Sequence, residues 1–241
     1  MLVAQKPWRV PALVVAGKVF VVSEPISLPD LKEALSNFRV EEAREEDEQE
    51  FTLVREVRDL AERPGSLMGI YAEDFITRVF HRGKPVLVPR TFEALFCFAE
   101  HAGHLFLVVL EKKRRANLVA NRLSEAVFGR VGAIVEARIP PEVLEEFHKK
   151  NPEETKVIFF DNVDIPNVNK LALYGPDLVN TDLFEQYRAH GDIWYVVSKA
   201  GGYDYVVGIT RDGSVTIFNT NDRLAYLDYV LKEVLPMASR S

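Results

Sequence analysis

Two strand-like runs, each followed at once by an amphipathic helix, constrain the fold of this chain more than any other feature. The first is LFLVVLEKKRRANLVANRLSEAVF at residues 105–128, and the second is VTIFNTNDRLAYLDYVLKEVL at residues 215–235. In the first, the apolar residues recur at helical spacing from Ala116 to Val127, so one face of a helix is apolar. The repetition predicts an α+β protein built from two similar halves.

The rest of the chain is rich in strand patterns. Pro89 indicates a bulge or an edge strand, Arg82-Gly83-Lys84 a hairpin connection, and Asp212-Gly213 a tight turn. The acidic segment at 41–50 is expected to be a solvated loop or an extension of an edge strand. Residues 13–22 are predicted to be a strand or a tight hairpin, and residues 51–60 fit either a strand or a helix. The other predicted strands are 67–81, 85–98, 105–110, 131–139, 156–160, 169–174, 193–198, 205–210 and 214–218. The predicted helices are 28–36, 112–128, 140–150, 177–189 and a last helix capped at 219–221, with Leu224, Leu227, Leu231 and Val234 as its apolar stripe.

Each half therefore has the order strand, helix, antiparallel strands and long helix. This order resembles the duplicated TATA-binding-protein-like fold over nearly the whole chain, in architecture only. None of that family's sequence motifs is found, so no DNA-binding residue is carried over. The resemblance implies two pseudo-repeated halves, 1–129 and 130–241, either separate or within one continuous domain. Each half would be a curved, mainly antiparallel sheet with helices packed on one face, and the open face would be the first place to look for a binding surface.

Composition indicates an intracellular protein. No run approaches the roughly 18 apolar residues that a membrane span needs, and Pro7 and Pro11 interrupt the segment where a signal peptide would be apolar. Cys97 is the single cysteine, so no intrachain disulfide can form. These features favour the cytoplasm and no membrane partner. Scarce Gln and plentiful charge and valine are typical of a thermophilic source.

The segment CFAEHAGH contains the first candidate for chemistry. Cys97, His101 and His104, with His81 as a fourth ligand, offer the sulfur and nitrogen atoms that zinc prefers. Their spacing matches no standard zinc pattern. The favoured interpretation is a buried cysteine that packs as a small apolar residue, followed by two loop histidines.

Acidic residues follow the strand KVIFF. Asp161 and Asp164, with His190 later in the chain, would suit a divalent cation and general-base chemistry in a hydrolase or nuclease. Against this stands the ordinary use of Asp and Asn to turn the chain after a strand, which Pro166 and Asn167 support.

A basic run opens the helix at 112–128. Between residues 111 and 130 six basic residues stand against two acids, although the whole chain has a net charge of −6. Clustered cations bind phosphates and release counterions, but no aromatic residues interleave with them to stack bases. The predicted nucleic-acid-binding residues are Lys112, Lys113, Arg114, Arg115 and Arg122.

No phosphate-binding, hydrolase or metalloprotease motif occurs. The sequence therefore favours a non-enzymatic binding protein without a cofactor, with nucleic acid as the leading partner class. Two alternatives stay open. One is the metal-dependent hydrolase or nuclease that uses Asp161 and Asp164, and the other is a protein-interaction module whose acidic 41–50 segment binds a basic partner. The oligomeric state is left open.

Overall fold

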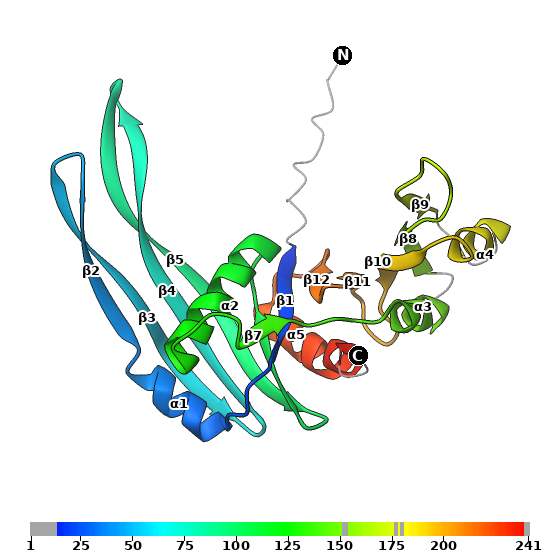
Figure 1. The fold of residues 1–241 in the computed structure, drawn as a ribbon, viewed down its shortest axis with the longest axis horizontal. Helices are drawn as coiled ribbons and strands as arrows, with labels where there is room; N and C mark the ends of the chain where they lie inside the picture. The colour runs from blue at the N-terminus through cyan, green and yellow to red at the C-terminus, as the bar shows by residue number, and fades with distance from the viewer. Residues whose placement is uncertain (1–13, 151–153, 176–177, 179–180, 239–241) are drawn as a thin grey trace, which may run out of the picture.

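The computed structural model describes residues 14–150, 154–175, 178 and 181–238 (Figure 1). The predicted N-terminal features Pro7 and Pro11, and part of the predicted helix at 177–189, lie outside these ranges. The strands are β1 (Val15–Val22), β2 (Arg39–Glu46), β3 (Gln49–Arg63), β4 (Ser66–His81), β5 (Lys84–His101), β6 (His104–Val109), β7 (Ile134–Glu136), β8 (Thr155–Asp161), β9 (Leu171–Tyr174), β10 (Asp192–Lys199), β11 (Val206–Thr210) and β12 (Ser214–Ile217). The helices are α1 (Leu28–Ser36), α2 (Lys113–Phe128), α3 (Pro141–Lys150), α4 (Asp182–Arg188), α5 (Arg223–Tyr229), a π-helical turn η2 (Val230–Val234) and α6 (Leu235–Ala238).

All the described strands belong to one open sheet. Its 12 strands follow the order β2-β3-β4-β5-β6-β1-β12-β11-β10-β8-β9, and the short β7 pairs with β1. Strand β1 lies between β6 and β12, so it joins the strands of the first half to those of the second. Every pairing is antiparallel.

The sheet has a hydrophobic core on each face. Successive side chains of a strand point to opposite faces, and in β1 the buried Val19 joins one core while the buried Phe20 joins the other. Helices α1 and α2 supply the Phe20 core, and α3 to α6 supply the Val19 core. The helices of the two halves therefore lie on opposite faces of one sheet.

Local sequence accounts for the main helices. Helix α2 buries the predicted stripe of Ala116, Val119, Ala120 and Leu123 and ends at Gly129, whose φ of 68° is left-handed. Helix α3 starts at Pro141, where proline is tolerated because the first turn needs no N–H donor.

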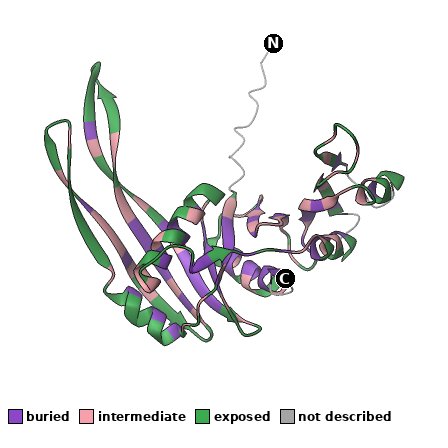
Figure 2. Ribbon diagram, in the orientation of Figure 1, coloured by how far each residue is buried: buried purple, intermediate pink, exposed green. Residues whose placement is uncertain are grey.

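Two hairpins, β2–β3 and β4–β5, extend side by side from one end of the sheet (Figure 1). Their outer parts are mostly exposed, apart from the buried Leu87, and in β4 and β5 burial increases toward the inner ends (Figure 2). The acidic segment is thus an edge-strand extension, the second of the two predicted forms. Pro89 is in an edge position as predicted, because β6 pairs only with Phe96–His101 of β5.

The last helix differs from its prediction. Its N-cap is Asp222, whose carboxylate accepts from Leu224 and Ala225, while Asn219 accepts from the Val206 N–H. The predicted stripe is wrong at Leu224, which is 48% exposed. The turn η2 precedes Pro236, which lacks an N–H and displaces the carbonyl four residues before it, so the helical period changes. The residues buried in its place include Tyr226, Tyr229 and Val230.

The predicted α+β class with a large antiparallel sheet is confirmed. The strand predicted at 131–139 is shorter, at Ile134–Glu136. The sheet continues through both predicted halves, and neither the division at residues 129 and 130 nor the repeat is tested by this arrangement. None of the described helices has the length and apolar character needed to cross a membrane.

Candidate nucleic-acid interface

The start of α2 is a concentration of positive charge. Lys112 is the N-cap, with extended backbone and no side-chain cap, and the first turn contains no acidic residue. The backbone N–H groups of a first turn are unpaired and carry the positive end of the helix dipole. Four exposed cations at that end repel the positive end of the helix dipole. A bound anion would relieve this repulsion and stabilise the helix start. The four predicted residues Lys112, Lys113, Arg114 and Arg115 lie together here.

The predicted cations differ in how far they are neutralised. Lys113 pairs with Asp212, and the Arg115 guanidinium lies 4.9 Å from the ring centroid of Phe92. Within the described residues, neither Lys112 nor Arg114 has an ion pair. Arg122 lies further along the helix and pairs with Glu73 at 3.4 Å and Glu125 at 3.1 Å. It is therefore the weakest of the five as a phosphate ligand.

A buried lysine anchors this helix start to the sheet. The Lys18 side chain is fully buried, and its Nζ donates to Glu136 at 2.6 Å and to Asp212 at 3.2 Å. Asn117 of α2 donates to the same Glu136 oxygen at 2.8 Å. Burial alone would raise the pKa of Asp212, but hydrogen bonds from Lys113 and other donors, with the Lys18 charge, lower it below its ordinary value. The sequence signal for Lys18 was a lysine inside the apolar run LVVAGKVFVV.

A cavity of about 240 Å³ opens beside Lys113. The Arg211 guanidinium closes one side of it by donating to both carboxylate oxygens of Asp161, at 3.0 and 2.8 Å. The cavity brings a helix of the first half next to strands of the second. Its lining residues are Lys113, Asp161, Trp194, Thr210, Arg211, Asp212 and Ser214.

The cavity wall at Trp194 belongs to an aromatic cluster that we call the aromatic face: Phe159, Tyr174, Trp194 and Tyr195. A bulge in β10 against β8 interrupts the alternation, and both Trp194 and Tyr195 contact Phe159, with centroids 5.5 Å apart in each pair. Tyr174 lies 5.6 Å from Phe159 and is 68% exposed. The Trp194 Nε1 is buried and has no hydrogen-bond partner among the described residues.

The aromatic face lies on the side of the sheet away from α3 to α6. Phe160, next to Phe159, packs into the core on the helix side, so Phe159 points away from those helices. The Tyr195 ring lies directly over Gly208, and a glycine is needed at this position because a Cβ would lie 2.6 Å from the Tyr195 hydroxyl. Lys170 adds a cation 4.8 Å from the Trp194 ring. The basic helix start thus has aromatic neighbours that a linear sequence does not reveal, because Lys113 and Trp194 are far apart in the chain.

The acidic candidates are only partly brought together. His190 Nδ1 lies 2.8 Å from the Asp164 carboxylate, at an exposed turn. Asp161 faces Arg211 instead, and both of its oxygens are engaged. Among the described residues, no group of three or more His, Cys, Asp or Glu side chains is arranged to hold a metal ion. The hydrolase or nuclease alternative stays a prediction.

The cysteine and histidine candidates are dispersed along the sheet. Cys97 is buried in β5, and burial raises the pKa of its thiol to about 11, above its ordinary value. His101 and His104 pair across the β5–β6 turn. Four residues of strand, about 13 Å, separate Cys97 from His101, and His81 lies at the far tip of the β4–β5 hairpin. The geometry agrees with the favoured interpretation of a buried apolar cysteine.

A comparison of the chain with models of known protein families finds no match, and a comparison with curated proteins finds none either.

Proposed function

We propose that this protein is a non-enzymatic, cytoplasmic binding protein for single-stranded nucleic acid. Unpaired bases would stack on the aromatic face, and phosphates would bind at the start of α2. The observation that carries this proposal is the cavity lined by both Lys113 and Trp194. It joins a stacking surface to a phosphate-binding helix start.

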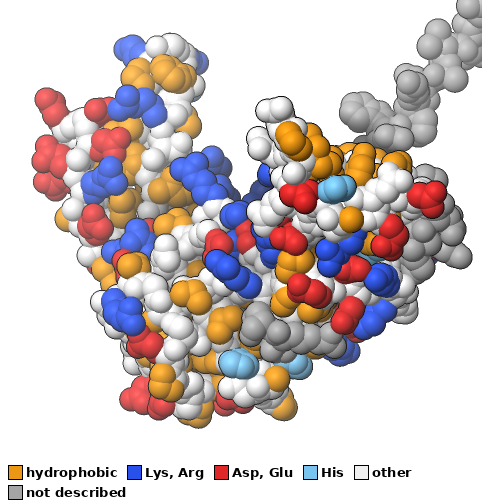
Figure 3. All heavy atoms as spheres, turned by 45° about the vertical axis from the view of Figure 1, so that its right-hand side comes forward, with side chains coloured by type: hydrophobic (Ala, Val, Ile, Leu, Met, Phe, Trp, Pro, Cys, Tyr) orange, Lys and Arg blue, Asp and Glu red, His pale blue; other side chains and the backbone are white. Residues whose placement is uncertain are grey.

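The chemistry of the surface supports a single strand. Stacking of a base on an aromatic side chain is worth about 1–3 kcal/mol and tolerates any sequence. Lys170 lies 4.8 Å from the centroid of the Trp194 ring and adds a cation that a phosphate could contact beside a stacked base. With a net charge of −6, the chain has no global attraction to nucleic acid, so local positive charge must supply it. Figure 3 shows Lys and Arg side chains in the hollow between the tall hairpin and the body.

The two-half organisation belongs to the same proposal. The units β4–β5–β6–α2 and β10–β11–β12–α5 have the same order of elements, which supports duplication. The basic cluster belongs to the first unit, and Trp194 and Tyr195 of the aromatic face belong to the second. Divergence of two copies would give each half one part of the binding surface.

Fluorescence of Trp194 provides the direct test. The chain has two tryptophans, so Trp8→Phe leaves Trp194 as the single indole. Stacking of a base should quench it during titration with a short DNA or RNA strand. Trp194→Ala should weaken binding about tenfold, the equivalent of about 1.4 kcal/mol of stacking. A Trp194 signal that does not respond, at concentrations where anisotropy reports binding, contradicts the proposal.

Salt dependence tests the phosphate part. Four phosphate contacts predict a slope of about −3 for log affinity against log salt with a single strand. Lys112→Ser with Arg114→Ser should reduce that slope by about 1 to 2 units. Lys32→Ser with Arg44→Ser is the control, because both residues are exposed cations outside α2. Equal slopes for the two double variants contradict the assignment of phosphates to α2.

A further inference from the structure

The outer part of the β4–β5 hairpin, residues 75–91, is a two-stranded ribbon that we call the arm, and the ion pair between Arg78 and Asp47 links it to the β2–β3 turn. Cross-strand pairs run without a break from Phe75↔Arg90 to His81↔Lys84. Within the described residues, β3 pairs with β4 only up to Glu73, and β6 pairs with β5 only from Phe96 inward. The seven residues from Phe75 to His81 correspond to about 23 Å of strand.

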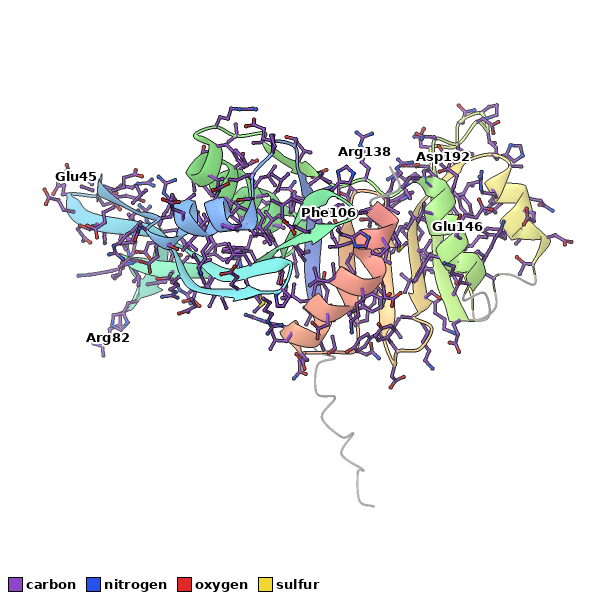
Figure 4. All side chains as sticks on the ribbon, turned by 90° about the horizontal axis from the view of Figure 1, so that it is seen from below. Glu45, Arg82, Phe106, Arg138, Glu146 and Asp192 are labelled. Carbon is purple, nitrogen blue, oxygen red and sulfur yellow. The ribbon has the colours of Figure 1, made fainter. Side chains whose placement is uncertain are left out.

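The arm is basic and its tip is apolar. It contains four Lys or Arg residues and no Asp or Glu. Phe80 is 76% exposed, and it pairs across the ribbon with the exposed Pro85. Figure 3 shows apolar and basic side chains together on the tall projection. Arg82 extends from the tip at the end of the molecule opposite Asp192 (Figure 4).

The cations of the arm lie on both of its faces. Residues that pair directly share a face, so Lys84 and Arg90 lie on the face of Phe75, while Arg78 lies on the face of Phe80. Arg78 is held by Asp47 at 2.7 Å, whereas Arg82, Lys84 and Arg90 have no ion pair among the described residues. The unpaired cations thus lie on the Phe75 face and at the tip. A groove between two phosphate backbones would contact both of these sets at once, whereas a flat anionic surface would contact only one of them.

These features fit the wide groove of duplex DNA. The major groove of B-form DNA is about 12 Å wide and admits a two-stranded β-ribbon, whereas that of A-form RNA is deep and narrow. The arm reaches across about seven base pairs at 3.4 Å each. The exposed Phe80 near its tip can make an apolar contact with the methyl group of thymine, which lies in that groove.

We propose that the arm enters the groove of duplex DNA, and that the preferred ligand is a junction between duplex and single strand. The single-strand part of this inference rests on the function proposed above. The neighbouring β2–β3 hairpin carries eight acids against three basic residues between 39 and 56. It repels the DNA backbone, so the duplex approaches the arm from the side away from that hairpin.

Fluorescence anisotropy on three labelled ligands tests the inference: a single strand, a blunt DNA duplex and a DNA fork with one single-stranded tail. The native chain should bind the fork about tenfold more tightly than the single strand, because the arm adds phosphate contacts. Phe80→Ser and Arg82→Ser/Lys84→Ser should abolish this preference and leave single-strand affinity unchanged. Leu183→Ser, an exposed apolar residue on α4, is the matched control and should keep the preference.

The outcomes separate the two proposals. If the fork preference is absent from the native chain or survives in both arm variants, the arm inference is wrong while single-strand binding stands. If Trp194→Ala leaves single-strand binding intact and the arm variants lose the fork preference, the aromatic-face site of the proposed function is wrong and the arm inference holds. Arm variants that lose binding only to vesicles containing phosphatidylserine would overturn the DNA assignment in favour of a membrane.

Discussion

Lys18 shows how one buried charge can fix the position of a binding surface. Its ammonium group joins β1 to Glu136 of β7 and to Asp212 of the β11–β12 turn. Asp212 also forms an ion pair with Lys113 at the start of α2. A buried cation is costly to desolvate and persists only when paired. The lysine therefore holds the basic helix start at the edge of the aromatic face.

Lys18→Met should destabilise the protein by about 3 kcal/mol, because the variant leaves two carboxylates without their buried partner. Urea denaturation measures this change. Lys113→Met is the matched control: it removes an exposed partner of the same Asp212. Its cost should stay below about 1 kcal/mol, as for surface ion pairs. An equal loss of unfolding free energy in the two variants would show that the buried Lys18 stabilises the fold no more than the exposed Lys113 does.

His148 should make stability depend on pH near neutrality. Burial lowers its pKa, the charge of Glu145 opposes this change, and Lys149 adds to it. The unfolded chain then takes up the proton first, so the free energy of unfolding falls as the pH is lowered through about 6.5. Urea denaturation between pH 7.5 and 5.5 should show this fall. His148→Asn should flatten it, whereas His81→Asn, an exposed change on the arm, should not.

At the scale of single residues, the sequence predicted the basic cluster and missed its neighbours. Lys112 to Arg115 are adjacent in the chain, so their grouping needs no tertiary information. Trp194 reaches Lys113 only through the pairing of β10 with β11 and the position of α2. Such long-range placement is invisible in a single sequence. The same reason explains why Arg211 could not be predicted as the partner of Asp161.

Among the elements, strand β11 has a glycine on which the aromatic face depends. A Cβ at Gly208 would meet the far end of Tyr195 at 2.6 Å, and that side chain can move. Gly208→Ala should therefore cost about 1 kcal/mol of stability and displace Tyr195. Affinity for a single strand should fall about fivefold, from about 1 kcal/mol of lost stacking. Anisotropy and thermal unfolding measure the two effects.

Gly17→Ala in β1 is the control for this prediction. Its Cβ would lie 2.8 Å from the Val109 carbonyl, a backbone atom, and 2.6 Å from the buried Tyr226 hydroxyl. Neither neighbour can yield easily, so the loss of stability should exceed that of Gly208→Ala. Binding should be unchanged at temperatures where the variant is folded. Weakened binding in Gly17→Ala alone would contradict the role given to the aromatic face.

Elements with strong local signals were predicted well. Gly83 and Gly213 have the positive φ that glycine adopts readily in turns, at 77° and 75°. Helix α2 follows its apolar period. The last helix departs from its prediction at Leu224, which is exposed, whereas Leu227 and Val234 of the predicted stripe are buried. Tyr226 and Tyr229, which the predicted stripe did not include, lie in the same core.

At the scale of the whole molecule, one strand decides the architecture. Strand β1 lies between β6 and β12, so it pairs with the last strand of the first half on one edge and with the last strand of the second half on the other. The alternation of Val19 and Phe20 then separates the two cores. A sequence repeat predicts similar halves but does not state on which face each helix packs. That choice leaves one face of the second half uncovered by the described helices, and the aromatic face occupies it.

The arm should be separable from this architecture. No residue between 75 and 91 belongs to either core. The pair His81↔Lys84 flanks the native two-residue turn. Directly opposite pairs alternate between hydrogen-bonded and non-hydrogen-bonded types, and Phe75↔Arg90 is of the same type as His81↔Lys84 because the two pairs are an even number of residues apart. Replacing residues 76–89 with Asn-Gly, the residues preferred in such turns, should therefore close the hairpin without strain.

This shortened chain should unfold within about 2 °C of the native chain, because the removed part contributes no buried contacts to the cores. It should bind a single strand with native affinity and bind the DNA fork no more tightly than the single strand. A control chain that keeps the arm but carries Arg44→Ser on β2 should retain the fork preference. A shortened chain that no longer folds would show that the arm stabilises the sheet. One that folds and still prefers the fork would place duplex recognition elsewhere on the molecule.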